Sequence, residues 1–302
     1  MTVIGIVGAG AVGQATAVAL STARLATELV VVSRTRDQAA ALATDVHDQC
    51  ITLAWPCRIH PGTATDLQSC DIVVIAVRAP FHNTRTHAIR MAGLHANTTL
   101  ITQLGTHLRG HTGVILVLTN PVDLMSRLLA DTAQPCRVYG IGSALDSARY
   151  RAILAHHLTV PVTTITGHVI GEHGDAAVIC ASSTTVNGQP LTLNLNHVQT
   201  QLHARPETIR SGIGRVRAGP AGATVSALHK ILGLTDGIEE LSTLYQDGWL
   251  GVPLRFTRGQ PELAMPILNP HEAHQFADAH AKLRHLYDTL HQHTTPEPKE
   301  HP

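Results

Sequence analysis

The most constraining feature of the chain is a glycine-rich turn near its start, between an apolar run and an alanine-rich segment. "TVIGIV" (residues 2–7) is short and β-branched, which is typical of a buried strand, and "QATAVALSTARL" (residues 14–25) has the composition of a helix. Between them, Gly8 allows a tight turn, Gly10 lets the backbone approach a pyrophosphate, and Gly13 lets the helix pack on the strand. Because the free N–H groups and the dipole of a helix N-terminus favour an anion, this segment predicts a dinucleotide-binding site.

Further apolar runs follow at residues 28–33, 71–77, 113–119 and 137–142, with helical segments such as residues 37–48 between them. Continuous apolar strands that alternate with helices indicate a parallel sheet covered on both faces. The sequence therefore predicts an α/β fold, with a Rossmann-type doubly wound parallel sheet over residues 1–142.

The pattern changes from residue 143 onward, where the apolar runs become shorter and more polar. Long helical segments are expected around residues 194–210, 222–232 and 271–291, and the last begins with Asn269 as a cap and Pro270 in its first turn. We expect residues 143–302 to form a C-terminal α+β substrate domain. Its polar, proline-containing end, about residues 292–302, is expected to be disordered.

Composition excludes several classes of function. The 302 residues contain 22 basic and 22 acidic residues, so no excess positive charge favours nucleic acid. "MTVIGIVGAG" lacks a basic segment and its apolar run is broken by glycines, which argues against a signal peptide or a membrane span and favours a cytoplasmic protein. The five cysteines include no Cys-x-x-Cys pair and are expected to be free, buried thiols. "HEAH" with His280 does not have the spacing of a zinc site, so no metal is predicted.

Three segments carry reactive side chains, and each follows or ends an apolar run: "TNPVD" (residues 119–123), "GSALDSARYR" (142–151) and "GHVIGEHGD" (167–175). Asp146 and Arg149 are three residues apart, a spacing that places both on one face of a helix. Loops at strand ends are where α/β proteins place their functional groups.

These residue types suggest a redox site for a 2-hydroxy acid. His173 can donate and accept a proton near neutral pH, and a carboxylate, for which Asp146 is the candidate, would fix its tautomer. Arg149 could hold a substrate carboxylate by a two-point hydrogen bond. The alternatives are a structural histidine and a surface ion pair between Asp146 and Arg149.

"GAGAVG", "TNPVD", "LDSAR" and "IGEHGD", in this order, resemble the motifs of the lactate/malate dehydrogenase family, which includes L-2-hydroxyisocaproate dehydrogenases. The resemblance implies that His173 is the acid/base, Asp146 its partner and Arg149 the carboxylate clamp. It implies that Asn120 hydrogen-bonds near the substrate and the nicotinamide. It also implies that Arg85, at the end of "APFHNTR", polarises the substrate carbonyl as a loop closes, and that the chain forms a homodimer or homotetramer.

The end of the second strand bears on the choice of cofactor. Members of this family that use NAD have an acidic residue here, which binds the ribose hydroxyls, whereas this chain has Ser33 followed by Arg34. A carboxylate would repel the 2′-phosphate of NADP, and an arginine, Arg34 and in addition Arg36, could pair with it. The sequence therefore predicts NADP rather than NAD. The alternative is that both arginines face solvent and Ser33 only weakens NAD binding.

Together these features predict an NADP-preferring oxidoreductase that interconverts a 2-keto acid and an L-2-hydroxy acid, with a small molecule as its substrate. Two alternatives remain: an NAD-dependent malate or lactate dehydrogenase, and a catalytically idle nucleotide-binding or redox-sensing protein on the same fold. The substrate side chain is left open, because Arg78 could meet a second carboxylate while Phe81 could line an apolar pocket.

Overall fold

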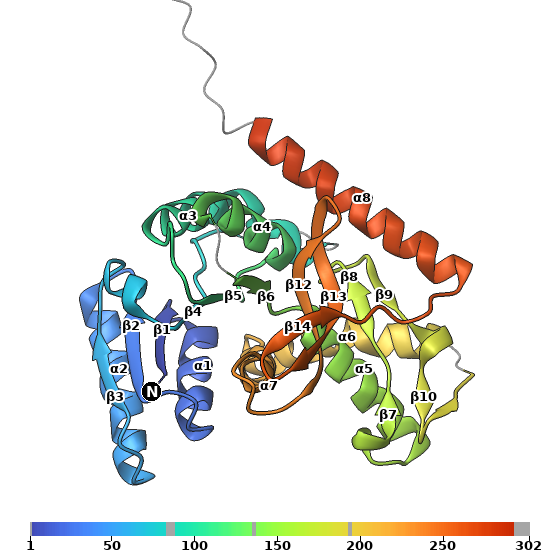
Figure 1. Cartoon of the computed structure of the whole chain (residues 1–302), viewed down its shortest axis with the longest axis horizontal. Helices are drawn as coiled ribbons and strands as arrows, with labels where there is room; N and C mark the ends of the chain where they lie inside the picture. The colour runs from blue at the N-terminus through green and yellow to red at the C-terminus, as the bar shows by residue number, and fades with distance from the viewer. Residues whose placement is uncertain (1, 83–87, 135–136, 193–194, 293–302) are drawn as a thin grey trace, which may run out of the picture.

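The structure is a computed structural model that describes residues 2–82, 88–134, 137–192 and 195–292 (Figure 1). In its N-terminal half six parallel strands lie in the order β3-β2-β1-β4-β5-β6. Their bounds are β1 Val3–Val7, β2 Glu28–Val32, β3 Arg58–Pro61, β4 Ile72–Ile75, β5 Val114–Val117 and β6 Arg137–Gly140. The helices of this half are α1 Ala11–Thr22, α2 Arg36–Thr52, α3 Leu94–His107 and α4 Val122–Ala133, with 3₁₀ turns η1 Asp66–Ser69 and η2 Ile89–Gly93. The predicted doubly wound parallel sheet is confirmed.

The direction of winding reverses between β1 and β4. Because crossovers between parallel strands are right-handed, α1 and α2 cover one face of the sheet while α3 and α4 cover the other. The loops that leave the carboxyl ends of β1 and β4 therefore diverge, and an open α/β sheet binds its ligands in the crevice outside such a reversal. The glycine turn after β1 lies at this place.

The C-terminal half combines helices with antiparallel strands. Its helices are α5 Ser143–Leu158, α6 Leu195–Ile213, α7 Ala218–Ile231 and α8 Pro270–Gln292, with 3₁₀ turns η3 Val162–Thr164 and η4 Ala181–Ser183. Its strands are β7 Ile165–Thr166, β8 Val169–Gly171, β9 Ala177–Ile179, β10 Thr185–Val186, β11 Gln189–Pro190, β12 Gly237–Tyr245, β13 Gly248–Thr257 and β14 Gln260–Leu263. The α+β character expected of this half is confirmed.

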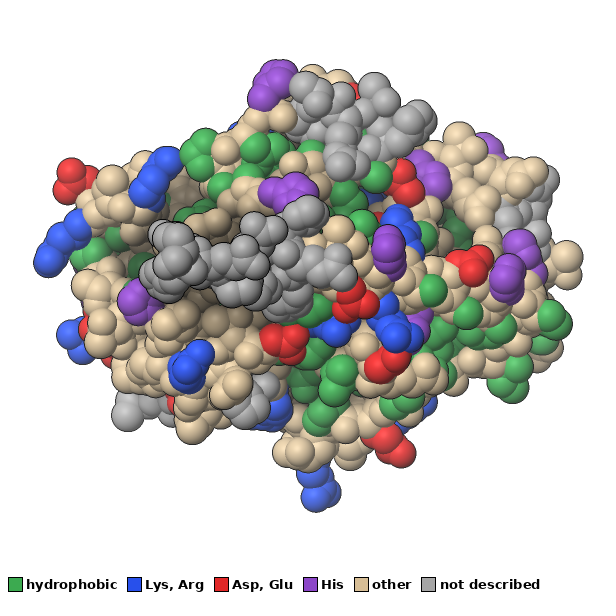
Figure 2. All heavy atoms as spheres, turned by 90° about the horizontal axis from the view of Figure 1, so that it is seen from above, with side chains coloured by type: hydrophobic (Ala, Val, Ile, Leu, Met, Phe, Trp, Pro, Cys, Tyr) green, Lys and Arg blue, Asp and Glu red, His purple; other side chains and the backbone are tan. Residues whose placement is uncertain are grey.

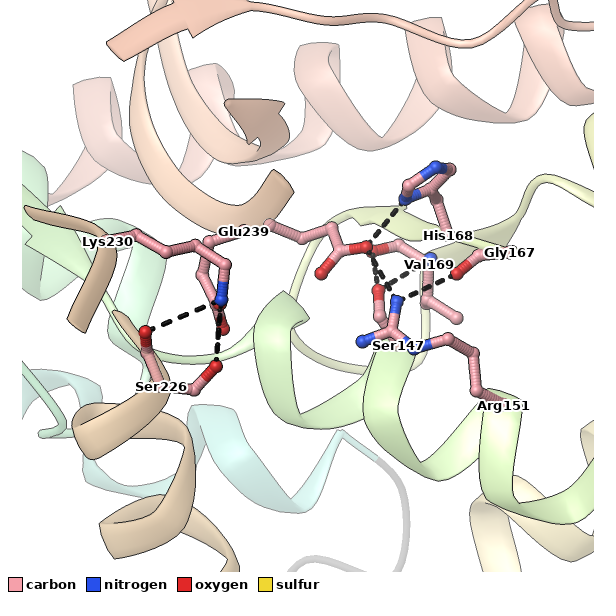
Figure 3. Close-up of polar contacts among 9 residues, drawn as sticks. Ser147, Arg151, Gly167, His168, Val169, Ser226, Lys230 and Glu239 are labelled. Atoms are coloured by element: carbon pink, nitrogen blue, oxygen red, sulfur yellow. Dashed lines mark hydrogen bonds and ion pairs between the residues drawn. The ribbon is translucent and has the colours of Figure 1, made fainter. Parts of the chain in front are cut away.

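The hairpin of β12 and β13 differs from the expectation of short strands, because these are the longest strands described, at 9 and 10 residues. Two adjacent acidic residues interrupt the apolar pattern of β12, so the sequence does not indicate a buried strand there. Glu239 and Glu240 are 5% and 1% exposed. Lys230 Nζ lies 2.5 Å from Glu239 Oε2 (Figure 3), and Arg151 Nη1 lies 3.1 Å from Glu240 Oε1. These cations allow both carboxylates to be buried within a strand.

The hairpin also joins the two halves into one hydrogen-bonded sheet. Ser242 of β12 pairs with Gly140 at the end of β6, and Gly251 of β13 pairs with Gly171 at the end of β8. Both glycines end strands from which a functional loop departs. The junction of the halves therefore lies next to the start of α5, which carries Asp146, and next to the turn that carries His173.

Helix α8 begins as the sequence predicts. Asn269 Oδ1 accepts the N–H of Glu272 at 2.9 Å, and Glu272 Oε2 accepts the N–H of Asn269 at 3.1 Å, a reciprocal capping arrangement. The apolar face of the helix, which includes Phe276, Leu283 and Tyr287, is buried. It packs on β13 and β9 (Figure 1), so the helix covers this part of the sheet.

Acidic and basic side chains are interspersed on the face of the molecule shown in Figure 2, and histidines are spread over it. Among the described residues, no helix combines the length and apolar character needed to cross a membrane. Within the same residues, no group of three or more His, Cys, Asp and Glu side chains is placed to hold a metal ion. Cys50, Cys57, Cys70 and Cys180 are buried free thiols, and Cys136 lies outside the described residues.

Candidate active site

His173 and Asp146 meet at the junction of the two halves. His173 stands in the turn between β8 and β9, and Asp146 in the first turn of α5. His173 Nδ1 lies 2.6 Å from Asp146 Oδ2, and the residues are 8% and 4% exposed. A Cβ atom at Gly142 would lie 2.6 Å from the Cβ of His173, so only glycine lets the turn approach the start of α5 so closely.

The other oxygen of Asp146 faces two arginines. Arg149 Nη1 lies 3.4 Å and Arg90 Nη2 3.8 Å from Asp146 Oδ1. Burial by itself would raise the pKa of Asp146. The charge that His173 carries when protonated, its hydrogen bond to Asp146, and the positive charges of Arg90 and Arg149 outweigh burial and lower that pKa to about 2. Asp146 is therefore ionised across the physiological range.

The surroundings of His173 favour its neutral form. Burial lowers its pKa below the usual 6.5, the charge of Arg90 lowers it further, and Asp146 opposes both effects. An ionised carboxylate can only accept hydrogen bonds, so Nδ1 of His173 carries the proton that Asp146 receives. Nε2 is then the ring nitrogen available to a substrate.

Arg149 is buried beside this pair, with 6% of its surface exposed. That burial excludes a surface ion pair as the reason for its contact with Asp146. Among the described residues Asp146 is its one hydrogen-bond partner. A guanidinium has five N–H donors in a planar arrangement, so most of the Arg149 donors remain for an anionic ligand.

Arg90, in η2, was not singled out in the sequence, whereas Arg85 lies outside the described residues. The segment of Arg90 is fastened to the turn of His173, because Asp175 Oδ2 accepts the N–H of Ala88 at 2.8 Å. Arg78, Arg85 and Arg90 occur in the same stretch of sequence. Sequence spacing could not show that Arg90 reaches Asp146, because that contact depends on the path of the chain after β4.

Asn120 follows β5 and is held by its backbone. Its carbonyl oxygen accepts Asn97 Nδ2 at 2.8 Å, and Asn97 Oδ1 accepts the N–H of Ala79 at 2.8 Å. The side-chain Oδ1 of Asn120 is buried and has no hydrogen-bond partner among the described residues. It is therefore an acceptor that a bound donor group could use.

Strand β8, which leads to His173, is held against α5 by side chains of that helix. Ser147 Oγ accepts the N–H of Val169 at 2.8 Å, and Arg151 Nη1 donates to the carbonyl of Gly167 at 3.0 Å (Figure 3). His168 Nδ1 lies 2.6 Å from the buried Glu240 Oε1. Helix α5 thus presents Asp146 and Arg149 to the site and holds β8 with side chains of the same turns.

The glycine turn after β1 has the shape that a dinucleotide needs. Gly8 has a φ of +111°, and a Cβ atom at Gly13 would lie 1.7 Å from the carbonyl oxygen of Gly8. A Cβ atom at Gly10 would meet nothing within 4 Å, so this glycine borders open space. Gly10 precedes α1, whose first turn has neither a side-chain cap nor an acidic residue. The free N–H groups of α1 therefore fit a pyrophosphate.

Ser33 and Arg34 lie beside this turn, because the N–H of Gly8 donates to the carbonyl of Val32 at 2.8 Å. Ser33 Oγ lies 3.2 Å from Gln38 Oε1. Arg34 is exposed, and within the described residues no hydrogen bond or ion pair engages its side chain. Arg36 is the first residue of α2, so the loop itself contributes only Arg34.

Arg78 and Phe81 contact each other. The guanidinium carbon of Arg78 lies 4.3 Å from the centre of the Phe81 ring, and a Cβ atom at Gly93 would lie 2.9 Å from that ring. Burial and the charge of Arg215 lower the pKa of Arg78. Since the two side chains stack on each other, the structure leaves both of their expected roles in substrate choice open.

Two family models together match nearly the whole chain. The model described as lactate/malate dehydrogenase, NAD binding domain, matches residues 2–140, and the model described as lactate/malate dehydrogenase, alpha/beta C-terminal domain, matches residues 143–292. The chain belongs to the lactate/malate dehydrogenase family. This confirms the resemblance seen in the sequence motifs.

Two relatives illustrate the range within this lactate/malate dehydrogenase family. An L-lactate dehydrogenase of Deinococcus radiodurans is 34% identical over 190 residues, which are 62% of this chain and 61% of that enzyme. A malate dehydrogenase of Haloferax volcanii is 30% identical over 307 aligned positions, covering 96% of this chain and 100% of that enzyme. The chain thus spans less than two thirds of the former relative and the full length of the latter.

Solved structures of the family have the same fold. A minor L-lactate dehydrogenase from Enterococcus mundtii, in its ligand-bound form, superposes with a TM-score of 0.88 at 25% identity and covers 95% of this chain and 98% of that one. The malate dehydrogenase of Plasmodium falciparum has a TM-score of 0.88 at 17% identity, over 97% of this chain and 99% of that one. The latter likeness concerns the fold alone.

Proposed function

We propose that the chain is an NADP-preferring dehydrogenase that interconverts a 2-keto acid and an L-2-hydroxy acid. The observation that carries this proposal is the buried cluster around Asp146, whose two oxygens meet His173 on one side and Arg149 and Arg90 on the other. A proton-transfer group beside two arginines suits a substrate that has a carboxylate next to a carbonyl or hydroxyl.

When bound, a nicotinamide cofactor supplies a hydride to the substrate C2 or removes one from it. During reduction, protonated His173 gives its Nε2 proton to the keto oxygen, which becomes the hydroxyl. During oxidation, neutral His173 takes the hydroxyl proton. Asp146 stays ionised in both directions and stabilises the imidazolium that forms.

The two arginines differ in burial and so in proposed role. Arg149, which is almost fully buried, holds the substrate carboxylate by two parallel hydrogen bonds. Arg90, whose side chain is 24% exposed, polarises the substrate carbonyl and lowers the pKa of His173. We propose Arg90 for the polarising role because its guanidinium lies beside Asp146, the partner of His173. The same role for Arg85 stays a sequence-based prediction.

The dinucleotide is proposed to bind to residues 1–142, and residues 143–302 are proposed to supply His173, Asp146 and Arg149. The uncapped start of α1 after Gly10 would bind the pyrophosphate. Asn120 Oδ1, buried and unpartnered among the described residues, would accept an N–H of the nicotinamide amide or a hydroxyl of the substrate. A homodimer or homotetramer, expected from the family, remains a proposal.

The preference for NADP is supported by charge at the end of β2. Ser33 places no carboxylate there, and the exposed Arg34 is free to approach a 2′-phosphate from the loop. A phosphate monoester carries close to two negative charges, so an arginine favours it and an acidic residue opposes it.

The proposal is tested by incubating the protein with NADPH or NADH and a panel of 2-keto acids that includes pyruvate, oxaloacetate and branched-chain keto acids. The decrease in absorbance at the nicotinamide band reports turnover. We expect turnover of at least one keto acid, with higher kcat/KM for NADPH. Binding of the cofactor without turnover of any keto acid would instead support the catalytically idle alternative.

A further inference from the structure

A second buried carboxyl contacts the turn that carries His173. Asp123, the last residue of "TNPVD", lies in the first turn of α4 and is 2% exposed. Its Oδ2 accepts the backbone N–H of His173 at 2.8 Å. Asp123 thus fixes the main chain of His173, whereas Asp146 fixes its ring.

Three buried carboxyls lie at this turn, and Asp123 differs from the other two. Asp146 faces Arg149 and Arg90. Glu172, which is 2% exposed, accepts Lys282 Nζ at 2.6 Å. Among the described residues no cation pairs with Asp123. An ionised carboxylate that is buried without a cation is strongly unfavourable, and such groups bind a proton instead.

The second oxygen of Asp123 points to the same conclusion. Asp123 Oδ1 and the hydroxyls of Ser126 and Ser242 are all buried and, among the described residues, without a hydrogen-bond partner. The two serines converge, because a Cβ atom at Gly140 would lie 2.7 Å from Ser126 Oγ and 2.8 Å from Ser242 Cβ. A carboxylic acid can donate a hydrogen bond to a hydroxyl, whereas a carboxylate cannot.

The electrostatic surroundings agree with this geometry. Burial raises the pKa of Asp123 to about 7, with contributions from the negative charges of Glu172 and Asp146. The N–H of His173 and the nearby Ser242 oppose the rise but do not cancel it. Ser242 is therefore close enough to the carboxyl to affect its pKa.

We propose that Asp123 is a positioning residue that works in its protonated, neutral form: its carbonyl oxygen holds the His173 N–H, and its O–H donates into the pair of hydroxyls of Ser126 and Ser242. The catalytic consequence rests on the proposed acid/base function of His173. Loss of the Asp123 proton places a further negative charge near Asp146 and His173. That charge stabilises the imidazolium and changes how the site titrates around neutral pH.

Protonation is tested first without turnover, by measuring chemical unfolding of the full chain and its Asp123→Asn variant from pH 4 to pH 8. If Asp123 holds its proton in the native state, the unfolded chain releases a proton that the native state keeps. Wild type then loses stability relative to Asp123→Asn as pH rises from about 4 to about 7, by about tenfold in the unfolding equilibrium constant per pH unit.

A surface variant, Asp48→Asn on α2, is the matched control and is expected to run parallel to wild type across this range. If the difference between wild type and Asp123→Asn is constant or grows with pH, Asp123 is ionised and the proposal is overturned. Because this measurement needs no substrate, it stands even if the proposed dehydrogenase activity is not found.

The positioning role is tested by the kcat of Asp123→Asn and Asp123→Ala. The amide can accept the His173 N–H and donate to a hydroxyl, so we expect it to retain about tenfold more kcat than the alanine variant. We also expect the wild-type pH profile of kcat/KM to contain an ionisation near 7 that the amide variant lacks. Equal losses in both variants, or an unchanged profile in Asp123→Asn, would overturn the positioning role.

Discussion

His173 Nδ1 and Asp146 Oδ2 are 2.6 Å apart in a buried contact between residues that are 27 positions apart in the chain. Replacing Asp146 with Asn removes the charge that stabilises the imidazolium and presents an amide that can donate to Nδ1, which favours the wrong tautomer. We expect kcat to fall by about a hundredfold to ten-thousandfold. Steady-state kinetics together with cofactor titration check this, with Asp48→Asn as the surface control. A variant with near-normal kcat would show that the contact is structural.

Arg149 has a planar set of donors that an ammonium group cannot replace. Arg149→Lys should keep a positive charge beside Asp146 but lose the two-point contact with a carboxylate. We expect KM for the keto acid to rise by about tenfold to a hundredfold, which corresponds to the loss of one charge-assisted hydrogen bond of about 1.5–3 kcal/mol. Arg109→Lys, at an exposed site, is the control. An unchanged KM would exclude Arg149 as the carboxylate clamp.

Arg90 acts on the protonation of His173 through its charge. In reduction the protonated form of His173 is required, so kcat/KM is expected to fall as pH rises through an apparent pKa below 6.5. Arg90→Met removes a positive charge that lowers the pKa of His173, and should therefore move this decline to higher pH while lowering its maximum. The pH dependence of kcat/KM for wild type, Arg90→Met and the surface variant Arg109→Met checks this. A lower maximum with an unshifted pH profile would show that Arg90 does not affect the pKa of His173.

Cofactor preference depends on Ser33 and Arg34 in this account. Arg34→Ala should weaken NADPH by about tenfold to a hundredfold and leave NADH nearly unchanged, since only NADPH carries the 2′-phosphate. Ser33→Asp should invert the preference, because it adds repulsion against the phosphate and a partner for the ribose hydroxyl. The measurement is kcat/KM with each cofactor, and Arg36→Ala tests whether the first residue of α2 contributes. Equal efficiencies in wild type that Arg34→Ala leaves unchanged would mean that the arginines are ordinary surface charges.

Local sequence patterns were sufficient to predict those features whose structure depends on residues close together in the chain. The glycine turn after β1 was predictable because its backbone demands glycine at Gly8 and Gly13. The start of α8 was predictable because Asn269 and Glu272 cap it within one turn. The pairing of His173 with Asp146 was predicted from the order of the motifs that contain them. Local periodicity alone does not show that two such separate segments come together.

Features that depend on tertiary contacts could not be predicted. The hairpin was missed because Glu239 and Glu240 look like exposed residues until Lys230 and Arg151 are placed beside them. Arg90 was missed for a similar reason, since its approach to Asp146 follows from the folding of a segment after β4. In both cases the missing information is an ion pair that forms only when separate elements fold against each other.

The most direct test of the central claim is the rate of reduction of the best keto acid by the His173→Asn variant, measured with saturating NADPH alongside the dissociation constant for NADPH. We expect the rate to fall by about a thousandfold or more, because the proton donor is lost, while NADPH binds as in wild type. A variant that reduces the keto acid at close to the wild-type rate would contradict the role of His173 as the acid/base, and with it the mechanism proposed here.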